Sequence, residues 1–436
     1  MDLSVVVKGI TFRNPIMPGS SELVRDEKDV VKCIKQGVGG IVTKSFTSTL
    51  RRTRPRPHYF PYRAAFGKGL EHIWTAQGMS HPLSCAQAAA ELVPKMARLC
   101  RDEGIPLVVS IADDIDVNEW ARDAKMFEEA GADMLELNFV GAHPMREAGK
   151  VLGRALGQDL DLTVKIIRAL KKVAKIPIYA KLGIDWGSVE SQVKLWLEAG
   201  ADGLICFNPF TGMLIDVEQE VPFGKLGIGG LSLGRAYLPI NLGKVVETRM
   251  LTDAPIIASG GVHYSGDAIM YLLVGCPLVE VTGAVFENGY RVLGEIIKGV
   301  EEWMERRGYS SINDFIGKAY ELAARKVSQD FVSMEWPFPF PEERSSPVVP
   351  TIDADKCNLC GQCQDFCLSG VYAVDMAKGI VDINHENRCW GCGACVGWCP
   401  LNAIKLIDKD SKEVVWDNRG LAKPYRPESW KDRITK

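Results

Sequence analysis

The sequence lacks the features that would place the protein in a membrane, on nucleic acid or outside the cell. No apolar run reaches the roughly 18 residues that a membrane-spanning helix needs. The 52 Lys and Arg residues nearly balance the 55 Asp and Glu residues, and the formal net charge of −3 gives no sign of nucleic-acid binding. Residues 1–4 contain no basic segment of the kind that opens a secretory signal. We therefore expect a cytoplasmic protein with no membrane span.

A nicotinamide-binding fingerprint is lacking as well. Residues 227–230 read Gly-Ile-Gly-Gly, but they do not follow an early strand in the way that a dinucleotide-binding turn does. We therefore expect no NAD(P)H-binding domain within the chain.

Cysteine, in contrast, is plentiful and patterned. Eight of the 13 cysteines form two runs with the spacing C-x2-C-x2-C-x3-C, and the second run repeats the first 32 positions later. The first run consists of Cys357, Cys360, Cys363 and Cys367, and the second of Cys389, Cys392, Cys395 and Cys399. The other five are expected to be buried free thiols, in keeping with a reducing compartment: Cys33, Cys85, Cys100, Cys206 and Cys276.

This spacing is typical of a ferredoxin with two [4Fe–4S] clusters, in which the fourth cysteine of each run binds the other cluster. One cluster would then take the first three cysteines of run one with Cys399, and the other the first three of run two with Cys367. Leu368 departs from the pattern, which usually has proline there. Two zinc sites are the alternative, although four thiolates suffice for one zinc and the third cysteine of each run would be surplus. The iron–sulfur interpretation makes this a protein that moves single electrons.

The first 310 residues alternate between apolar strands and helical patterns, which predicts a (β/α)8 TIM barrel. A doubly wound sheet is the alternative. The predicted strands are 15–18, 40–43, 106–111, 133–138, 177–182, 203–207, 255–259 and 278–282. The predicted helices are 29–36, 117–130, 161–173, 189–199, 242–248, 267–274 and 291–306.

The remaining chain divides into three predicted parts. Residues 311–350 form a connector, with a helical piece at 312–327 and an aromatic–proline run at 336–341. Residues 351–408 form a small α+β domain of the bacterial-ferredoxin type. Residues 409–436 form a polar tail with Trp416 and Trp430, which either wraps this domain or docks on a partner or a second copy.

Polar residues follow several of the predicted barrel strands, where barrel enzymes hold their active sites. Lys44, Asn138, Lys181 and Asn208 would all point into one mouth. Glycines after the last two strands offer backbone N–H groups for a phosphate. A phosphorylated cofactor that also exchanges single electrons with clusters fits FMN, and the lysines would stabilise negative charge on its reduced ring.

A long segment after the second strand, residues 46–80, is rich in proline and arginine. Its arginines would receive an anionic substrate group or an acidic partner, or would form a solvated loop: Arg51, Arg52, Arg54, Arg56 and Arg63.

Several short stretches together resemble the dihydroorotate dehydrogenase-like flavoproteins. The resemblance covers nearly the whole chain and is nearest to the carboxyl-terminal half of dihydropyrimidine dehydrogenase and its separate bacterial subunit. The stretches are FRNP at 12–15, TK at 43–44, LELN at 135–138, ALGQD at 155–159, AKL at 180–182, GGLS at 229–232 and SGGV at 259–262.

The resemblance implies an FMN site and a substrate above it. Asn138 and Asn208 would face the substrate. The residues implied in cofactor binding are Gly19, Ser20, Lys44, Ser45, Asn138, Lys181, Asn208, Gly230, Gly234, Gly260, Gly261, Thr282 and Gly283.

Two departures from the family pattern point to a changed substrate. Gly141 stands where family members usually carry the cysteine that transfers a proton, and glycine cannot do so. The family's substrate-binding asparagine is also missing from the matching region at 69–73. His143, on the same loop as Gly141, is the candidate general acid, with His72 and Glu71 as rivals.

Three functions remain open from the sequence. The first is an FMN and iron–sulfur oxidoreductase that transfers hydride between flavin and a C–C/C=C bond of a small activated substrate. The second is a uracil- or thymine-reducing dihydropyrimidine dehydrogenase subunit with a rearranged acid. The third is a non-catalytic electron relay. Each expects a separate electron-carrying protein, either an NAD(P)H-dependent flavoprotein subunit or a ferredoxin, in a homodimer or a hetero-oligomer.

Overall fold

The protein is described as a computed structural model, and it divides into two compact units, Met1–Gln329 and Asp330–Lys436. The structure describes residues 1–48, 59–61, 74–76, 80–112, 115–140, 146–147, 150–151, 154–183, 188–208, 210–222, 227–327, 348–384 and 386–418. The finer boundaries expected for a connector and a tail stay a prediction.

The first unit is built on eight parallel strands. They follow one another around the sheet in the order β3, β18, β17, β12, β11, β8, β7, β4. The two end strands approach each other, because the Gly39 N–H just before β4 donates to the Ile16 carbonyl of β3 at 2.8 Å. This cyclic order confirms the predicted TIM barrel and excludes the doubly wound sheet. The strands are β3 (Ile16–Pro18), β4 (Ile41–Val42), β7 (Leu107–Ile111), β8 (Met134–Leu137), β11 (Ile178–Gly183), β12 (Gly203–Asn208), β17 (Ile256–Ser259) and β18 (Leu278–Val281).

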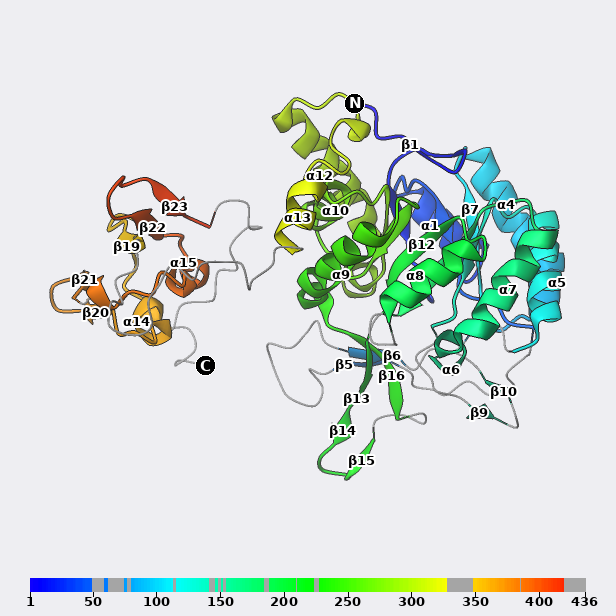
Figure 1. Ribbon diagram of the computed structural model, residues 1–436, viewed down its shortest axis with the longest axis horizontal. Helices are drawn as coiled ribbons and strands as arrows, with labels where there is room; N and C mark the ends of the chain where they lie inside the picture. Colours follow the sequence, from blue (N-terminus) through cyan, green and yellow to red (C-terminus); the bar gives the residue numbers. More distant parts are fainter. Residues whose placement is uncertain are drawn as a thin grey trace. The chain divides into compact units, whose positions relative to one another are not determined.

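Helices surround these strands (Figure 1). Each buries one face against the strands and exposes the other; in α7, for example, Ile166, Ile167 and Leu170 are buried. Side-chain caps begin several of them, such as Asp159 before α7 and Ser188 before α8. The longer helices are α1 (Glu27–Ile34), α4 (Val93–Asp102), α5 (Val117–Glu129), α7 (Leu160–Val173), α8 (Val189–Glu198), α9 (Tyr237–Leu251), α10 (Ser265–Leu273) and α12 (Arg291–Arg307).

One of these helical segments was not predicted from the sequence, and other helices differ in length from the prediction. No helix was predicted between the second and third strands, but α3 (Cys85–Gln87), a π-helical turn (Ala88–Leu92) and α4 run there without a break. Pro94 near the start of α4 and the π-helical turn both disturb the regular apolar spacing that would have predicted a helix. The α9 helix extends well beyond the predicted 242–248. The helical piece predicted at 312–327 is a 3-10 turn (Ile312–Asp314) and a separate helix α13 (Tyr320–Val327).

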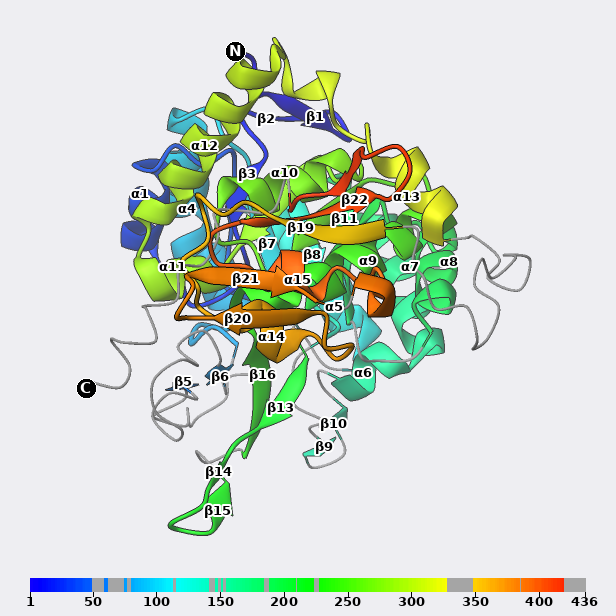
Figure 2. The ribbon, with the colours of Figure 1, turned by 90° about the vertical axis from the view of Figure 1, so that its left-hand side faces the viewer.

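Small antiparallel strands lie beyond the carboxyl ends of the barrel strands. A four-stranded sheet has the order β13 (Thr211–Met213), β16 (Ile228–Ser232), β6 (Trp74–Ala76), β5 (Tyr59–Pro61), and so joins the segments that follow β4 and β12. The β14 (Ile215–Asp216) and β15 (Val221–Pro222) hairpin extends from it, as Figure 2 shows. This sheet holds the chain from Gly230 to Gly234 beside the barrel mouth.

The second unit repeats one motif twice. Helices α14 (Gln362–Phe366) and α15 (Ala394–Trp398) each begin after a glycine with positive φ, Gly361 at 77° and Gly393 at 78°. Strands β20 (Tyr372–Asp375) and β21 (Ile380–Ile383) pair with each other, and β19 (Val348–Ile352), β22 (Ile404–Asp408) and β23 (Val414–Trp416) form a second sheet. The resulting α+β unit agrees with the fold predicted from the cysteine runs.

Among the residues that the structure describes, no helix has both the length and the apolar character to cross a membrane.

Candidate functional site

A cleft opens at the carboxyl ends of the barrel strands and encloses about 1140 Å³ of empty space, part of it open to solvent. Gly19 and Ser45, which were also predicted to bind the cofactor, lie next to it: a Cβ on Gly19 would stand 2.2 Å from Thr282 Oγ1, and Ser45 bonds to Ser20 and Asn138. The predicted residues that line the cleft are Ser20, Lys44, Asn138, Lys181, Asn208, Gly230, Gly234, Gly260, Gly261, Thr282 and Gly283. Distant strand ends therefore contribute to one site.

Lys181, on β11, is the charged centre of the cleft floor. Its Nζ lies 3.3 Å from Glu136 Oε2 on β8 and 3.2 Å from Glu280 Oε2 on β18, and all three side chains are almost fully buried. Burial disfavours the charge of the lysine, but the two carboxylates raise the pKa of Lys181 overall. The ammonium group is therefore charged and fixed in place.

Glu280, one of these two acids, has a raised pKa. Burial and the nearby Glu136 carboxylate raise the pKa of Glu280 to about 7, although the attraction of Lys181 opposes this shift. One lysine cannot neutralise two buried carboxylates, so a proton is held here near neutral pH.

A chain of hydroxyl groups connects this charge to Asn138. Ser110 Oγ donates to Glu136 Oε1 at 2.7 Å and lies 2.9 Å from Ser45 Oγ. Asn138 Nδ2 donates to the same Ser45 Oγ at 3.0 Å, and its Oδ1 accepts from the Val140 N–H. The Asn138 amide is therefore fixed in orientation before any ligand arrives.

Lys44 is the second cation of the cleft. Its Nζ lies 3.2 Å from Glu22 Oε1, and both side chains are largely shielded from solvent. Asn208 Nδ2 donates to the Val140 carbonyl, which fixes the second asparagine as well.

Glycines shape the opposite end of the cleft. Gly260 and Gly261 have φ values of 116° and 75°, and a Cβ on either would stand 2.4 Å from α9, at Tyr237 and at the Leu238 N–H. Among the described residues, the N–H groups of Gly261 and Gly283 donate no hydrogen bond. Such N–H groups at a glycine turn and at a helix start suit an anion such as a phosphate.

His263 lines the same end. Its Nε2 lies 3.1 Å from Glu287 Oε2, and its backbone N–H donates to Asp267 Oδ2. It places an imidazole beside the glycines, and it was not predicted from the sequence as a site residue.

These residues fit FMN. The glycine N–H groups at one end suit its phosphate, and the buried Lys181 ammonium suits a ring that gains negative charge on reduction. Asn138 and Asn208 present fixed amides to whatever lies over that ring.

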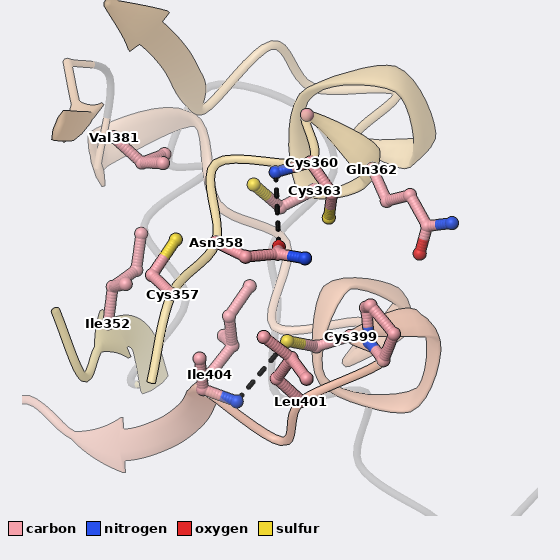
Figure 3. Close-up of a pocket in the computed structure, with 13 residues that line it drawn as sticks. Ile352, Cys357, Asn358, Cys360, Gln362, Cys363, Val381, Cys399, Leu401 and Ile404 are labelled. Atoms are coloured by element: carbon pink, nitrogen blue, oxygen red, sulfur yellow. Dashed lines mark hydrogen bonds between the residues drawn. The ribbon is translucent and has the colours of Figure 1, made fainter. Parts of the chain in front are cut away.

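In the second unit, cysteines from both runs meet. As Figure 3 shows, Cys357, Cys360 and Cys363 line one pocket with Cys399. The pocket has about 370 Å³ of empty space, part of it open to solvent. Burial and the charges of these same neighbours raise the pKa of Cys363 to about 11, against the hydrogen bond from the Gln364 N–H. The pocket therefore holds the first ligand set that the spacing predicts.

The other four cysteines also gather. Cys389 interacts electrostatically with Cys392 and Cys367, and Cys395 with Cys389 and Cys392. Among the described side chains, no three of Cys, His, Asp or Glu converge closely enough to share one metal ion.

The predicted catalytic loop lies outside the described residues. His143 and Gly141 are not among them, and neither are residues 69–73 or the arginines between 51 and 63. The assignment of His143 as the acid stays a prediction. Trp416 is described and packs on Gly393, whereas Trp430 lies outside the described residues.

Comparison with known families agrees with a flavin site in this cleft. The family described as Dihydroorotate dehydrogenase matches residues 2–304, and the 4Fe-4S dicluster domain matches residues 349–415. The chain belongs to the dihydroorotate dehydrogenase family and carries an iron–sulfur domain at its carboxyl-terminal side. It is therefore an oxidoreductase that acts on CH–CH groups, in a family that implies FMN and with a domain that implies [4Fe–4S] clusters rather than zinc.

Individual relatives extend over different parts of the chain. The NAD-dependent dihydropyrimidine dehydrogenase subunit PreA of Escherichia coli strain K12 is 30% identical over 427 residues, which cover 93% of this chain and 95% of that protein. The catalytic subunit of dihydroorotate dehydrogenase B (NAD(+)) from Methanothermobacter thermautotrophicus is 29% identical over 320 residues, 73% of this chain and 99% of that protein. The same subunit from Pyrococcus furiosus is 29% identical over 322 residues, 74% of this chain and the whole of that protein. The first of these thus matches the chain over both the barrel and the iron–sulfur domain.

The acids of the cleft were not predicted from the sequence. Glu136, Glu280 and Glu22 pair with the two predicted lysines, but none was named as a site residue. A signal was present, because Glu136 and Glu280 are charged residues inside the apolar runs of buried strands.

Proposed function

We propose that this protein is an FMN- and iron–sulfur-dependent oxidoreductase that transfers hydride between flavin and a C–C/C=C bond of a small activated substrate. Its two [4Fe–4S] clusters exchange electrons with a partner protein. The observation that carries the proposal is the presence, in one chain, of a cleft with a buried lysine and of two convergent cysteine sets.

The residues of the cleft divide the work. Bound FMN would exchange hydride with the substrate and single electrons with the clusters. Lys181 and Lys44 stabilise negative charge, and the backbone at Gly260, Gly261, Thr282 and Gly283 holds the phosphate. Asn138 and Asn208 orient the substrate. Gly19, Ser20, Ser45, Gly230 and Gly234 complete the cofactor site.

The eight cysteines hold the clusters in two crossed sets. One set is Cys357, Cys360, Cys363 and Cys399, and the other is Cys389, Cys392, Cys395 and Cys367. The grouping of these residues in the second unit supports the assignment.

The partner is an NAD(P)H-dependent flavoprotein subunit or a ferredoxin. The E. coli relative is named as a subunit of an NAD-dependent enzyme, which favours the flavoprotein. We place the enzyme in the cytoplasm, as a homodimer or a hetero-oligomer.

Pyrimidine reduction is the second candidate function, and the full-length similarity to the dihydropyrimidine dehydrogenase subunit favours it. The glycine at position 141, where the family usually has a proton-transferring cysteine, speaks for a different substrate or a rearranged acid. A non-catalytic electron relay is the third.

Anaerobic substrate screening tests the proposal. The protein is reduced with dithionite, and uracil, thymine, unsaturated acids and their thioesters are added in turn. Reoxidation of the flavin by one class of compound identifies the substrate. Reoxidation by uracil or thymine decides for the second candidate function, and no reoxidation by any compound favours the relay.

In the same assay His143→Asn is expected to lower turnover at least tenfold and to remove a pKa from its pH profile. An unchanged profile would exclude His143 as the acid.

A further inference from the structure

The cluster-binding unit carries an internal repeat with an offset of 32 residues. The Val371 N–H donates to Cys367 Sγ at 3.4 Å, and the Ala403 N–H donates to Cys399 Sγ at 3.2 Å. Positions 371 and 403 are 32 apart, as are the two cysteines. The backbone therefore gives both cluster sites one matching hydrogen bond.

The repeat is broken at the next position. Tyr372 begins β20 and Ile404 begins β22, and both are buried, with 5% and 3% of their surface exposed. They lie in one core cluster against Cys363, Cys367, Cys395 and Cys399. A hydroxyl group thus stands on one side of the pseudo-symmetric core and a hydrocarbon on the other.

The Tyr372 hydroxyl interacts with the Cys395 thiol but makes no hydrogen bond by geometry among the described residues. Among the described residues, no hydrogen bond of good geometry satisfies its buried oxygen. Among the side chains, Cys395 interacts most strongly with the Tyr372 hydroxyl, followed by Cys363 and Cys389. A buried hydroxyl without a partner is costly, which points to a group that the folded holoprotein supplies at this place.

We propose that Tyr372 donates a hydrogen bond to the sulfur of the cluster held by Cys389, Cys392, Cys395 and Cys367, and that this cluster has a higher reduction potential than the other. The inference rests on the two-cluster part of the proposed function. Ile404 offers the cluster of Cys357, Cys360, Cys363 and Cys399 no such donor.

The direction follows from electrostatics. A hydrogen-bond donor stabilises the reduced cluster, which carries one more negative charge, more than the oxidised one. The Gly391 N–H, which donates to Cys389 Sγ at 3.3 Å, acts in the same direction and is untouched by a change at Tyr372. Single electrons would therefore settle first on the cluster beside Tyr372.

A redox titration followed by electron paramagnetic resonance tests the proposal in the holoprotein. In Tyr372→Phe, one of the two one-electron midpoints is expected to fall by about 59 mV, equal to a tenfold change in the reduction equilibrium. Ile404→Leu is the matched control and should move neither midpoint. Ile404→Tyr should raise the other one. Unchanged midpoints in Tyr372→Phe would overturn the proposal.

A second measurement covers the case in which the variant does not assemble. In the wild-type protein, exchange into D₂O should remove one proton hyperfine coupling, that of the Tyr372 hydroxyl, from one reduced cluster. Couplings from buried backbone N–H groups, which exchange more slowly, should remain at first. Equal exchangeable couplings on both clusters would overturn the inference. Loss of iron from the wild-type protein itself would instead contradict the proposed function, so the two failures are distinguishable.

Discussion

At the scale of residues, the cleft depends on one lysine held between two acids. Lys181 is charged because Glu136 and Glu280 lie within 3.3 Å of its Nζ. One lysine cannot neutralise both of these buried carboxylates. The pKa of Glu280 is raised to about 7, so this carboxyl group is partly protonated at neutral pH. A proton can thus be taken up or released at Glu280 near neutral pH.

Glu280→Gln should therefore flatten the dependence of stability on pH. The folded-state pKa lies above the usual value, so the stabilisation from proton binding is fully present below pH 4.5 and is lost as pH rises through 7. The pH-dependent difference in the free energy of unfolding is on the order of 3 kcal/mol over that window. Thermal unfolding between pH 5 and 8 would measure it.

Glu305→Gln, an exposed change on α12, serves as the control and should reproduce the wild-type profile. A Glu280→Gln profile parallel to that of the wild type would contradict the assignment of the bound proton to Glu280.

Residue types also show what the sequence could and could not predict. The lysines and asparagines were predicted because strand ends in a barrel share one mouth, and all four line the cleft. The pairing of Lys181 with acids from β8 and β18 could not be predicted from spacing, because Glu136 and Glu280 lie 45 and 99 positions from Lys181 in the sequence.

At the scale of elements, the junction of β17 with α9 shapes the end of the cleft. Gly261 follows β17 and has a φ of 75°, and a Cβ there would stand 2.4 Å from the Leu238 N–H of α9. The two nearest atoms are the backbone N and Cα of Leu238, which cannot move aside as the end of a flexible side chain could.

Gly261→Ala should therefore cost at least about 2 kcal/mol of stability and lower the bound FMN content, because it adds both a strained φ and a backbone clash. Gly266→Ala, in α10, meets nothing within 4 Å and should be neutral or slightly stabilising. Thermal unfolding and flavin content of the two purified variants compare them directly. Equal flavin content and stability would refute this role of the turn.

Element boundaries show where sequence patterns lose their power. The eight strands were predicted because they are short, apolar and regularly spaced between helices. The continuous helical segment from α3 to α4 was not, since a π-helical turn and Pro94 interrupt its periodicity. The antiparallel sheet over the mouth escaped prediction because β6 and β16 lie more than 150 positions apart, and no local pattern records their pairing.

At the scale of the whole molecule, the chain joins a barrel of the dihydroorotate dehydrogenase family to an iron–sulfur domain. The order of the two units was evident from the sequence, since the cysteine runs occupy one end and the barrel pattern the other. Family membership supports FMN and [4Fe–4S] clusters, while the number of clusters and the route to a partner belong to the proposal. That the barrel and the iron–sulfur domain exchange electrons is therefore the claim to test.

The most direct test is an anaerobic reductive titration of the purified full chain, with iron, sulfide and flavin quantified beforehand. The account predicts about eight iron atoms and one FMN per chain, and flavin and cluster absorbance that dithionite bleaches within one titration. Zinc in place of iron and no flavin, or a flavin whose reduction is independent of the clusters, would contradict it.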